Sequence, residues 1–185
     1  DAVGNMTTVP QPGDWNDDYE LTFDAWNRLV KVEDGETTVA EYAYAGNHFR
    51  ITKATTTDGC VPVTETRHYY YDHRWRCLEE RVTAPDGCST PEPEDVDAEI
   101  QYVWGERYVD ELIFRDRDTT GNGTLNERLY AVQDANWNVV ALANSSGAIQ
   151  ERFIYSAYGT PSVLNADFTA KTGGTGFDWE FLFTG

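Results

Sequence analysis

The sequence predicts an all-β fold made of successive antiparallel hairpins. One short phrase recurs along the chain: an aromatic residue, Asp, two variable residues, a turn residue, then Arg or Asn and a strand-like run. β-Branched and aromatic residues dominate the periodic segments, and these segments alternate instead of showing helical spacing. A single hairpin cannot bury its apolar face, so the copies are expected to pair edge to edge in a continuous curved sheet.

Six segments carry the phrase, and each is expected to be a strand, a turn and a strand. In chain order they are DAVGNMTTV at the start, which opens within a phrase, FDAWNRLVKV (23–32), YAGNHFRITK (44–53), YDHRWRCLEERV (71–82), QDANWNVVAL (133–142) and YSAYGTPSVL (155–164). The motif residues are Phe23, Asp24, Asn27, Arg28, Tyr71, Asp72, Trp75, Arg76, Asp134, Trp137, Asn138, Tyr155, Tyr158 and Gly159. Aromatic residues at the hairpin ends are expected to stack in rows along the sheet.

The position three residues after the Asp sets the turn. It is occupied in order by Gly4, Asn27, His48, Trp75, Trp137 and Gly159. Gly adopts the left-handed conformation without strain, Asn and His tolerate it, and the Asp can accept a hydrogen bond from the backbone two residues on. Trp75 and Trp137 do not fit this rule, and we expect a bulge there that folds each indole back over its strand.

Polar and Pro- or Gly-rich stretches are expected to link the hairpins. They are VPQPGDWNDD (9–18), TAPDGCSTPEPEDVD (83–97) and RDTTGNGT (117–124). A fourth stretch, TAKTGGTG (169–176), is expected to be a flexible insertion.

The composition argues against several classes of protein. The formal net charge of −18 repels phosphate backbones, so nucleic acid is not expected as a partner. With 40% hydrophobic and 14% aromatic residues, the chain is too apolar for a disordered protein. No apolar run is long enough for a membrane helix, and neither a signal peptide nor an initial Met is visible, which suggests a piece of a longer chain.

The repeated phrase resembles the YD repeat of Rhs proteins, insecticidal toxin-complex C subunits and teneurins. Residues 127–164 resemble the start of the Rhs repeat-associated core, and WEFLFTG (179–185) resembles a later part of it. The core pattern falls on Tyr130, Asp134, Asn138, Val139, Ala141, Leu142, Gly147, Tyr155, Tyr158 and Gly159, with Trp137 in place of a Gly. The expected organisation is therefore YD-repeat hairpins over 1–115, an acidic loop over 116–126 and the start of the core over 127–185.

This resemblance implies a spiral β-shell that encloses or displays a C-terminal toxin or effector domain. The expected role is structural, the partners are neighbouring repeats and that domain, and the parent protein is expected to be secreted or at the cell surface. The alternative is a cell-surface or carbohydrate-binding β module whose exposed aromatic residues contact a ligand. No catalytic residue is assigned, because the family's DPxG segment is missing and no nucleophile, phosphate-loop or zinc-protease motif occurs. Glu79 and Glu80 are adjacent and should point to opposite faces of a strand as solvated charges. Enzyme activity is not expected.

One acidic stretch matches much of a calcium loop. Between Asp116 and Glu127, the ligands would be Asp116, Asp118, Thr120, the backbone carbonyl of Asn122 and a bidentate Glu127. The alternative is a polar hairpin loop in which Asp and Asn start turns and Gly supplies positive φ. Calcium is the only cofactor that this sequence suggests.

Three cysteines occur without CxxC spacing. Cys60 and Cys88 lie in matching contexts, TTDGC and APDGC, at equal distances from Arg74 at the centre of the 71–82 hairpin. They could therefore face each other across its base as a disulfide, which would imply an oxidising compartment. Two free thiols remain the alternative, because Pro85 and Asp86 could interrupt the pairing.

Overall fold

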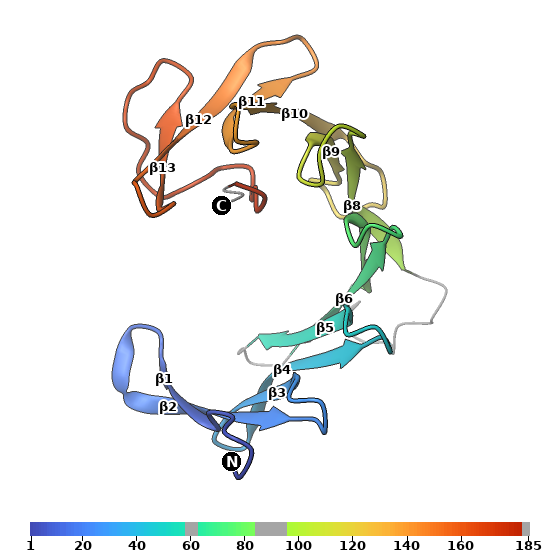
Figure 1. Ribbon diagram of the computed structural model, residues 1–185, viewed down its shortest axis with the longest axis vertical. Helices are drawn as coiled ribbons and strands as arrows, with labels where there is room; N and C mark the ends of the chain where they lie inside the picture. Colours follow the sequence, from blue (N-terminus) through green and yellow to red (C-terminus); the bar gives the residue numbers. More distant parts are fainter. Residues whose placement is uncertain (58–62, 84–95, 183–185) are drawn as a thin grey trace. The chain divides into compact units, whose positions relative to one another are not determined.

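The structure of the protein is a computed structural model, which describes residues 1–57, 63–83 and 96–182 (Figure 1). These residues form thirteen β-strands and no α-helix. The strands are Thr8–Gln11 (β1), Asp14–Phe23 (β2), Leu29–Asp34 (β3), Thr37–Tyr44 (β4), Arg50–Thr57 (β5), Val63–Tyr71 (β6), Cys77–Thr83 (β7), Asp97–Trp104 (β8), Leu112–Arg117 (β9), Glu127–Gln133 (β10), Val139–Asn144 (β11), Ile149–Tyr155 (β12) and Pro161–Asn165 (β13). Among the described residues, no helix could cross a membrane.

The strand order in the sheet follows the sequence from β1 to β13. The strand pairs with a described register are antiparallel, and the connections are therefore hairpins instead of crossovers. Leu21 lies opposite Val32, and Val32 lies opposite Ala40, which puts an apolar row across β2, β3 and β4. The predicted all-β fold of successive antiparallel hairpins is confirmed.

The chain divides into two compact units. Unit 1 comprises residues 1–70 and 80–97, and unit 2 comprises residues 71–79 and 98–185. This division differs from the boundaries expected from the sequence, 116 and 127. Asp116 and Arg117 belong to β9, and the acidic stretch connects β9 to β10 within unit 2.

The first expected linker is a hairpin. Residues 9–18 lie mostly in β1 and β2, which are joined at Gly13 with a φ of 92°. Glycine adopts this left-handed conformation without strain, so a tight turn forms where the Pro and Gly content indicated a linker. The second half of β2 alternates exposed and half-buried residues, with Tyr19, Leu21 and Phe23 on the more buried face.

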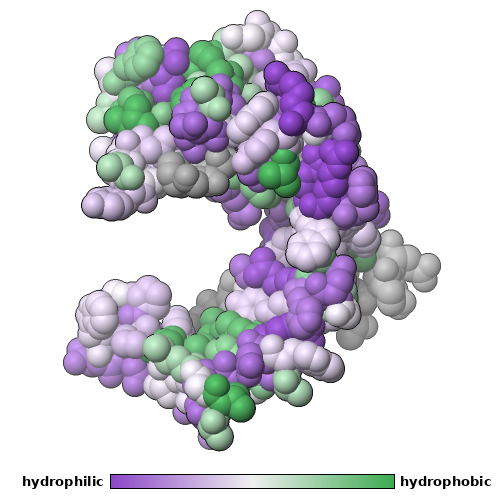
Figure 2. Space-filling view, in the orientation of Figure 1, coloured by the Kyte–Doolittle hydropathy of each residue, from purple (hydrophilic) through white to green (hydrophobic). Residues whose placement is uncertain are grey.

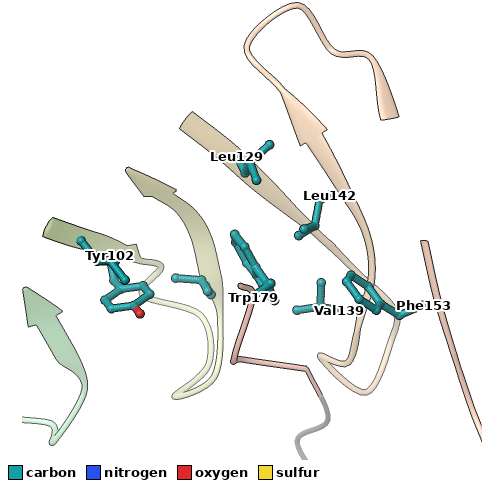
Figure 3. Close-up of a cluster of buried hydrophobic side chains, with 8 residues drawn as sticks. Tyr102, Leu129, Val139, Leu142, Phe153 and Trp179 are labelled. Carbon is teal, nitrogen blue, oxygen red and sulfur yellow. The ribbon is translucent and has the colours of Figure 1, made fainter. Parts of the chain in front are cut away.

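The hydrophobic core lies in unit 2. It consists of Ile100, Tyr102, Leu112, Leu129, Val139, Leu142, Phe153 and Trp179. Figure 3 shows Trp179, which comes from the C-terminal segment, lying among side chains from the strands. A single sheet needs a second layer to bury its apolar face, and here that layer is residues 171–182, which we call the C-terminal strap.

The C-terminal strap is fixed to the sheet by a buried carboxylate. Glu151 on β12 is 0% exposed, and it accepts hydrogen bonds from Lys171 Nζ, from Thr175 Oγ1 at 2.7 Å and from the Gly176 backbone N–H at 2.8 Å. Although burial opposes it, these contacts lower the pKa of Glu151. The expectation of a flexible 169–176 insertion is therefore wrong, because a carboxylate without water requires these partners.

Buried Arg115 holds the other half of the strap. Its guanidinium donates to the backbone carbonyls of Phe177 at 2.6 Å and Asp178 at 2.8 Å, and it lies 4.9 Å from the ring centroid of Trp179. Burial lowers the pKa of Arg115. The strap also meets β11, because the Val139 N–H donates to the Leu182 carbonyl at 2.9 Å.

Unit 1 buries fewer hydrophobic side chains than unit 2 does. Among its described hydrophobic residues, Ala40 alone is buried, and the strand residues around it are half-exposed on an open layer. Figure 2 shows hydrophilic side chains over much of the visible surface, as expected for a chain with a net charge of −18.

Candidate functional site

The repeated phrase forms a five-residue turn, best described at residues 24–28. The Asn27 N–H donates to the Asp24 carbonyl at 3.0 Å, and the Asp24 N–H donates to the Arg28 carbonyl at 2.9 Å. The strand register shifts between Thr22 and Phe23. These features describe a tight turn followed by a one-residue bulge in the left-handed conformation.

The same two backbone hydrogen bonds close eight turns in the described residues. They span residues 1–5, 24–28, 45–49, 72–76, 134–138, 144–148, 156–160 and 165–169. The turns that begin at Asn144 and Asn165 were missed from the sequence. The first could have been predicted from Asn144 and Gly147, because Asn starts turns and Gly takes positive φ. The second could not have been predicted from Phe168, which has no preference for positive φ.

The fourth turn position is left-handed in every copy. The φ values are 97° at Gly4, 61° at Asn27, 71° at His48, 74° at Trp75, 67° at Trp137, 80° at Gly147, 81° at Gly159 and 69° at Phe168. The prediction for Gly, Asn and His is confirmed. The expectation that the two tryptophans break the rule is wrong, because both adopt the same conformation as Gly, and the Trp75 side chain is 67% exposed.

In six of the eight turns, the first residue stabilises the turn through an oxygen of its side chain. Asp24 Oδ1 accepts from the N–H groups of Trp26 at 2.8 Å and Arg28 at 3.0 Å. Asp1, Asp72, Asp134, Asn144 and Ser156 accept from the residues two and four positions on in the same way. Ala45 has no such oxygen, so the backbone closes that turn without help.

The Asp and Arg of the phrase form an ion pair within the turn. Arg28 Nε donates to Asp24 Oδ2 at 2.7 Å, and Arg76 Nε donates to Asp72 Oδ2 at 2.9 Å. Partial burial raises the pKa of each Asp, but the hydrogen bonds from the Arg outweigh it and leave both pKa values below normal. In the 134–138 turn, Asn138 Nδ2 replaces the guanidinium at 3.0 Å from Asp134 Oδ2.

The same Arg also contacts the next hairpin. Arg28 Nη1 donates to the Ala45 carbonyl at 3.2 Å, and Arg76 Nη1 donates to the Gly105 carbonyl at 2.7 Å. Ala45 and Gly105 occupy equivalent positions, since each is the first residue of the next connection at the same end of the sheet, one connection at the opposite end lying between. Each Arg therefore fixes both its own turn and the start of the following one.

An aromatic residue returns this contact. The residue before the first turn position donates to the carbonyl just after the preceding turn at the same end of the sheet. The contacts are Tyr44 Oη to Leu29 at 2.7 Å, Trp104 Nε1 to Cys77 at 2.7 Å, and Tyr155 Oη to Val139 at 2.5 Å. Burial raises the pKa of Tyr155 to about 12. Two of the expected aromatic positions, Tyr44 and Tyr155, are thus hydrogen-bonding links between hairpins, and Trp104, which the sequence did not indicate, is a third. We call these three residues the aromatic ladder.

Other motif residues have other environments. Phe23 and Tyr71 precede their turns as Tyr155 does and are half-buried, while Tyr158 at the third turn position is 97% exposed. Glu79 accepts from Gln101 Nε2 at 2.6 Å, and Glu80 pairs with Arg67 at 3.0 Å. The adjacent carboxylates therefore have separate partners, but Glu80 is buried and not solvated as expected.

The acidic loop is organised around one carboxylate. Asp118 accepts from the Thr120 N–H at 2.7 Å, from Thr120 Oγ1 at 2.9 Å, and from the N–H groups of Gly121 at 3.0 Å and Gly123 at 2.6 Å. The hydrogen bond from the Thr120 N–H contributes most to lowering the pKa of Asp118 to about 2. Asn122 Oδ1 accepts from the Thr124 N–H at 2.9 Å.

The proposed calcium ligands do not converge. Asp116 forms a bidentate pair with Arg128 at 2.7 and 2.6 Å, and Glu127 binds Arg115 at 3.2 Å and Arg117 at 3.0 Å. Within residues 1–57, 63–83 and 96–182, no group of three or more His, Cys, Asp or Glu residues could hold a metal. These contacts favour the alternative of a polar hairpin loop.

Cys77 is half-buried, and its Sγ donates to the Glu79 carbonyl at 3.6 Å. The disulfide proposed between Cys60 and Cys88 involves residues outside those that the structure describes.

No protein-family model matches the chain, and no curated protein sequence matches it significantly.

Proposed function

We propose that this chain is a structural segment of an Rhs/YD-repeat shell or scaffold. In the parent protein it would adjoin further repeats and enclose or display a C-terminal toxin or effector domain, in a secreted or cell-surface setting. Its own residues would perform no catalysis.

One observation carries the proposal: a single turn geometry recurs eight times with the same backbone hydrogen bonds. The Asp and Arg of the phrase both have structural roles. They form an ion pair that closes one turn, and the Arg also donates to the first residue of the next connection at the same end of the sheet. Such hairpins are interchangeable units that stabilise their neighbours, which is how repeat proteins build extended surfaces.

The contacts of the charged groups also favour a structural role. Buried Glu151 and Arg115 are occupied by the C-terminal strap, and Asp24 and Asp72 are occupied by their arginines. Strongly perturbed groups in structural ion pairs are expected in a scaffold, whereas a catalytic site needs a group that can reach a substrate.

The test uses the full-length parent protein. Limited proteolysis should leave its C-terminal domain intact while the repeats are folded. The variant Arg76→Met, which removes the link from turn 72–76 to Gly105, should accelerate cleavage of that domain. Trp15→Ala is the matched control, because Trp15 is 84% exposed and its loss should leave the shell intact. Equal cleavage rates for the wild type and an isolated C-terminal domain would contradict the proposal.

A further inference from the structure

The loop between β9 and β10 contains a chemically sensitive pair of residues. Asn122 is followed by Gly123, and this is the only Asn–Gly pair in the sequence. The backbone nitrogen of the residue after an Asn can attack the Asn side chain, and Gly hinders this attack least because it has no side chain. The product is a cyclic succinimide. Water then opens the ring, which leaves Asp or isoaspartate in place of Asn.

The geometry of the loop requires this pair. Gly121 and Gly123 have φ values of 69° and 76°, in the left-handed region that most other residues rarely adopt. Asn122 Oδ1 accepts from the Thr124 N–H at 2.9 Å, which closes a turn that Asn favours. Asn122 is also exposed, so water can reach it. The local fold therefore places a reactive dipeptide at the surface.

Asp118 holds the nitrogen that would make the attack. The Gly123 N–H donates to Asp118 Oδ2 at 2.6 Å, and Asp118 itself is buried, with an exposed fraction of 8%. In the succinimide, the Gly123 nitrogen is bonded to Asn122 Cγ and carries no hydrogen. The ring therefore cannot form unless the hydrogen bond to Asp118 is lost.

The charge of Asp118 opposes the reaction as well. The attacking species is the Gly123 amide nitrogen after it has lost its proton, and this species is an anion. A carboxylate at hydrogen-bonding distance disfavours a second negative charge, so it raises the pKa of that amide. Asp118 does not remove the proton itself, because a carboxyl group whose pKa is about 2 is a very weak base. The hydrogen bond and the charge therefore act in the same direction.

We propose that Asn122 is a latent deamidation site that Asp118 keeps unreactive. In the suppressed reaction, the Gly123 nitrogen loses its proton to hydroxide and forms a bond to Asn122 Cγ. The Cγ–Nδ2 bond breaks, Nδ2 takes up a proton from water and leaves as ammonia, and a water molecule opens the succinimide. The loop would gain a negative charge, and isoaspartate would add one carbon atom to its main chain. The proposal is independent of the scaffold proposal, because this chemistry involves no C-terminal domain.

Peptide mapping by mass spectrometry tests the proposal on the whole chain. The folded chain and a synthetic peptide with the sequence of residues 117–127 are incubated at mildly alkaline pH, and deamidation is localised to Asn122 by fragmentation. The folded chain should react at least about tenfold more slowly than the peptide, because a rise of one unit in the pKa of the attacking nitrogen lowers the population of its anion about tenfold.

Asp118→Asn separates the charge from the hydrogen bond. It removes the charge but keeps a side-chain oxygen that can accept from the Gly123 N–H, and deamidation at Asn122 should be faster than in the wild type by about tenfold or more. Thr120→Val is the matched control. It removes another hydrogen bond to the same carboxylate, from Thr120 Oγ1 at 2.9 Å, and leaves the charge in place, so its rate should equal that of the wild type.

Near-UV circular dichroism checks that both variants are folded. The proposal is overturned if the wild type and the peptide deamidate at equal rates, or if folded Asp118→Asn is as slow as the wild type. Equal acceleration in Asp118→Asn and Thr120→Val would overturn it as well, because a looser loop would then explain both rates. None of these results bears on the protection of a C-terminal domain.

Discussion

The C-terminal strap makes a strong prediction about stability, which Trp179→Ala tests. Trp179 is 3% exposed, its Nε1 donates to the Phe181 carbonyl at 2.7 Å, and Arg115 lies over its ring at 4.9 Å. Truncating a fully packed Trp to Ala typically costs about 3–5 kcal/mol in free energy of unfolding. A domain has about 5–15 kcal/mol in total, so unit 2 would lose a large fraction of its stability.

Urea unfolding followed by circular dichroism measures this loss, and hydrogen exchange locates it. Amide protection should fall in β9 to β12, which pack against the strap, and should stay unchanged in β2 to β5 of unit 1. Trp15→Ala is the control, because an exposed substitution should change the unfolding free energy by no more than about 0.5 kcal/mol. A loss below about 1 kcal/mol for Trp179→Ala would show that the strap is not part of the core.

Three further predictions concern the turns and loops. Asp72→Ala should lower the urea midpoint more than Asp24→Ala, because the Asp72 ion pair is less exposed than the Asp24 pair, and the reverse order would contradict the role of burial. Ala45→Asp should raise the free energy of unfolding by about 0.5–1 kcal/mol, because it supplies the missing acceptor, and an unchanged midpoint would count against that role. The pKa of Asp118 is lowered to about 2, so its contribution to stability is complete above the normal Asp pKa and is lost as the pH falls toward 2. Asp118→Asn should remove this acid dependence in exchange rates of the Gly123 amide, and an identical pH profile would refute it.

The sequence predicted the fold class and the main turn position because both follow from local rules. Alternation identifies strands, and Gly4, Asn27 and Gly159 identify left-handed positions by their own conformational preferences. The same rule failed for Trp75 and Trp137. Their conformation is imposed by the hairpin around them, which fixes the fourth turn position whatever side chain it bears.

Long-range contacts were out of reach of this reasoning. Glycines in the 169–176 segment indicate flexibility locally, but buried Glu151 on β12 and backbone contacts to β13 hold the segment in place. The aromatic ladder was predicted in part, since the sequence indicated Tyr44 and Tyr155 but neither Trp104 nor the carbonyl groups that accept the hydrogen bonds.

The distance in sequence between Leu112 and Trp179, both in one core, has a consequence for biosynthesis. Ribosomes add about 5–20 residues per second, so the 67 residues from 112 to 179 take about 3–13 s to make. During that interval the strands of unit 2 have been synthesised, but the C-terminal strap that covers their apolar face has not. A chaperone that binds exposed aliphatic side chains would act during this interval, before Trp179 is synthesised and packs into the core.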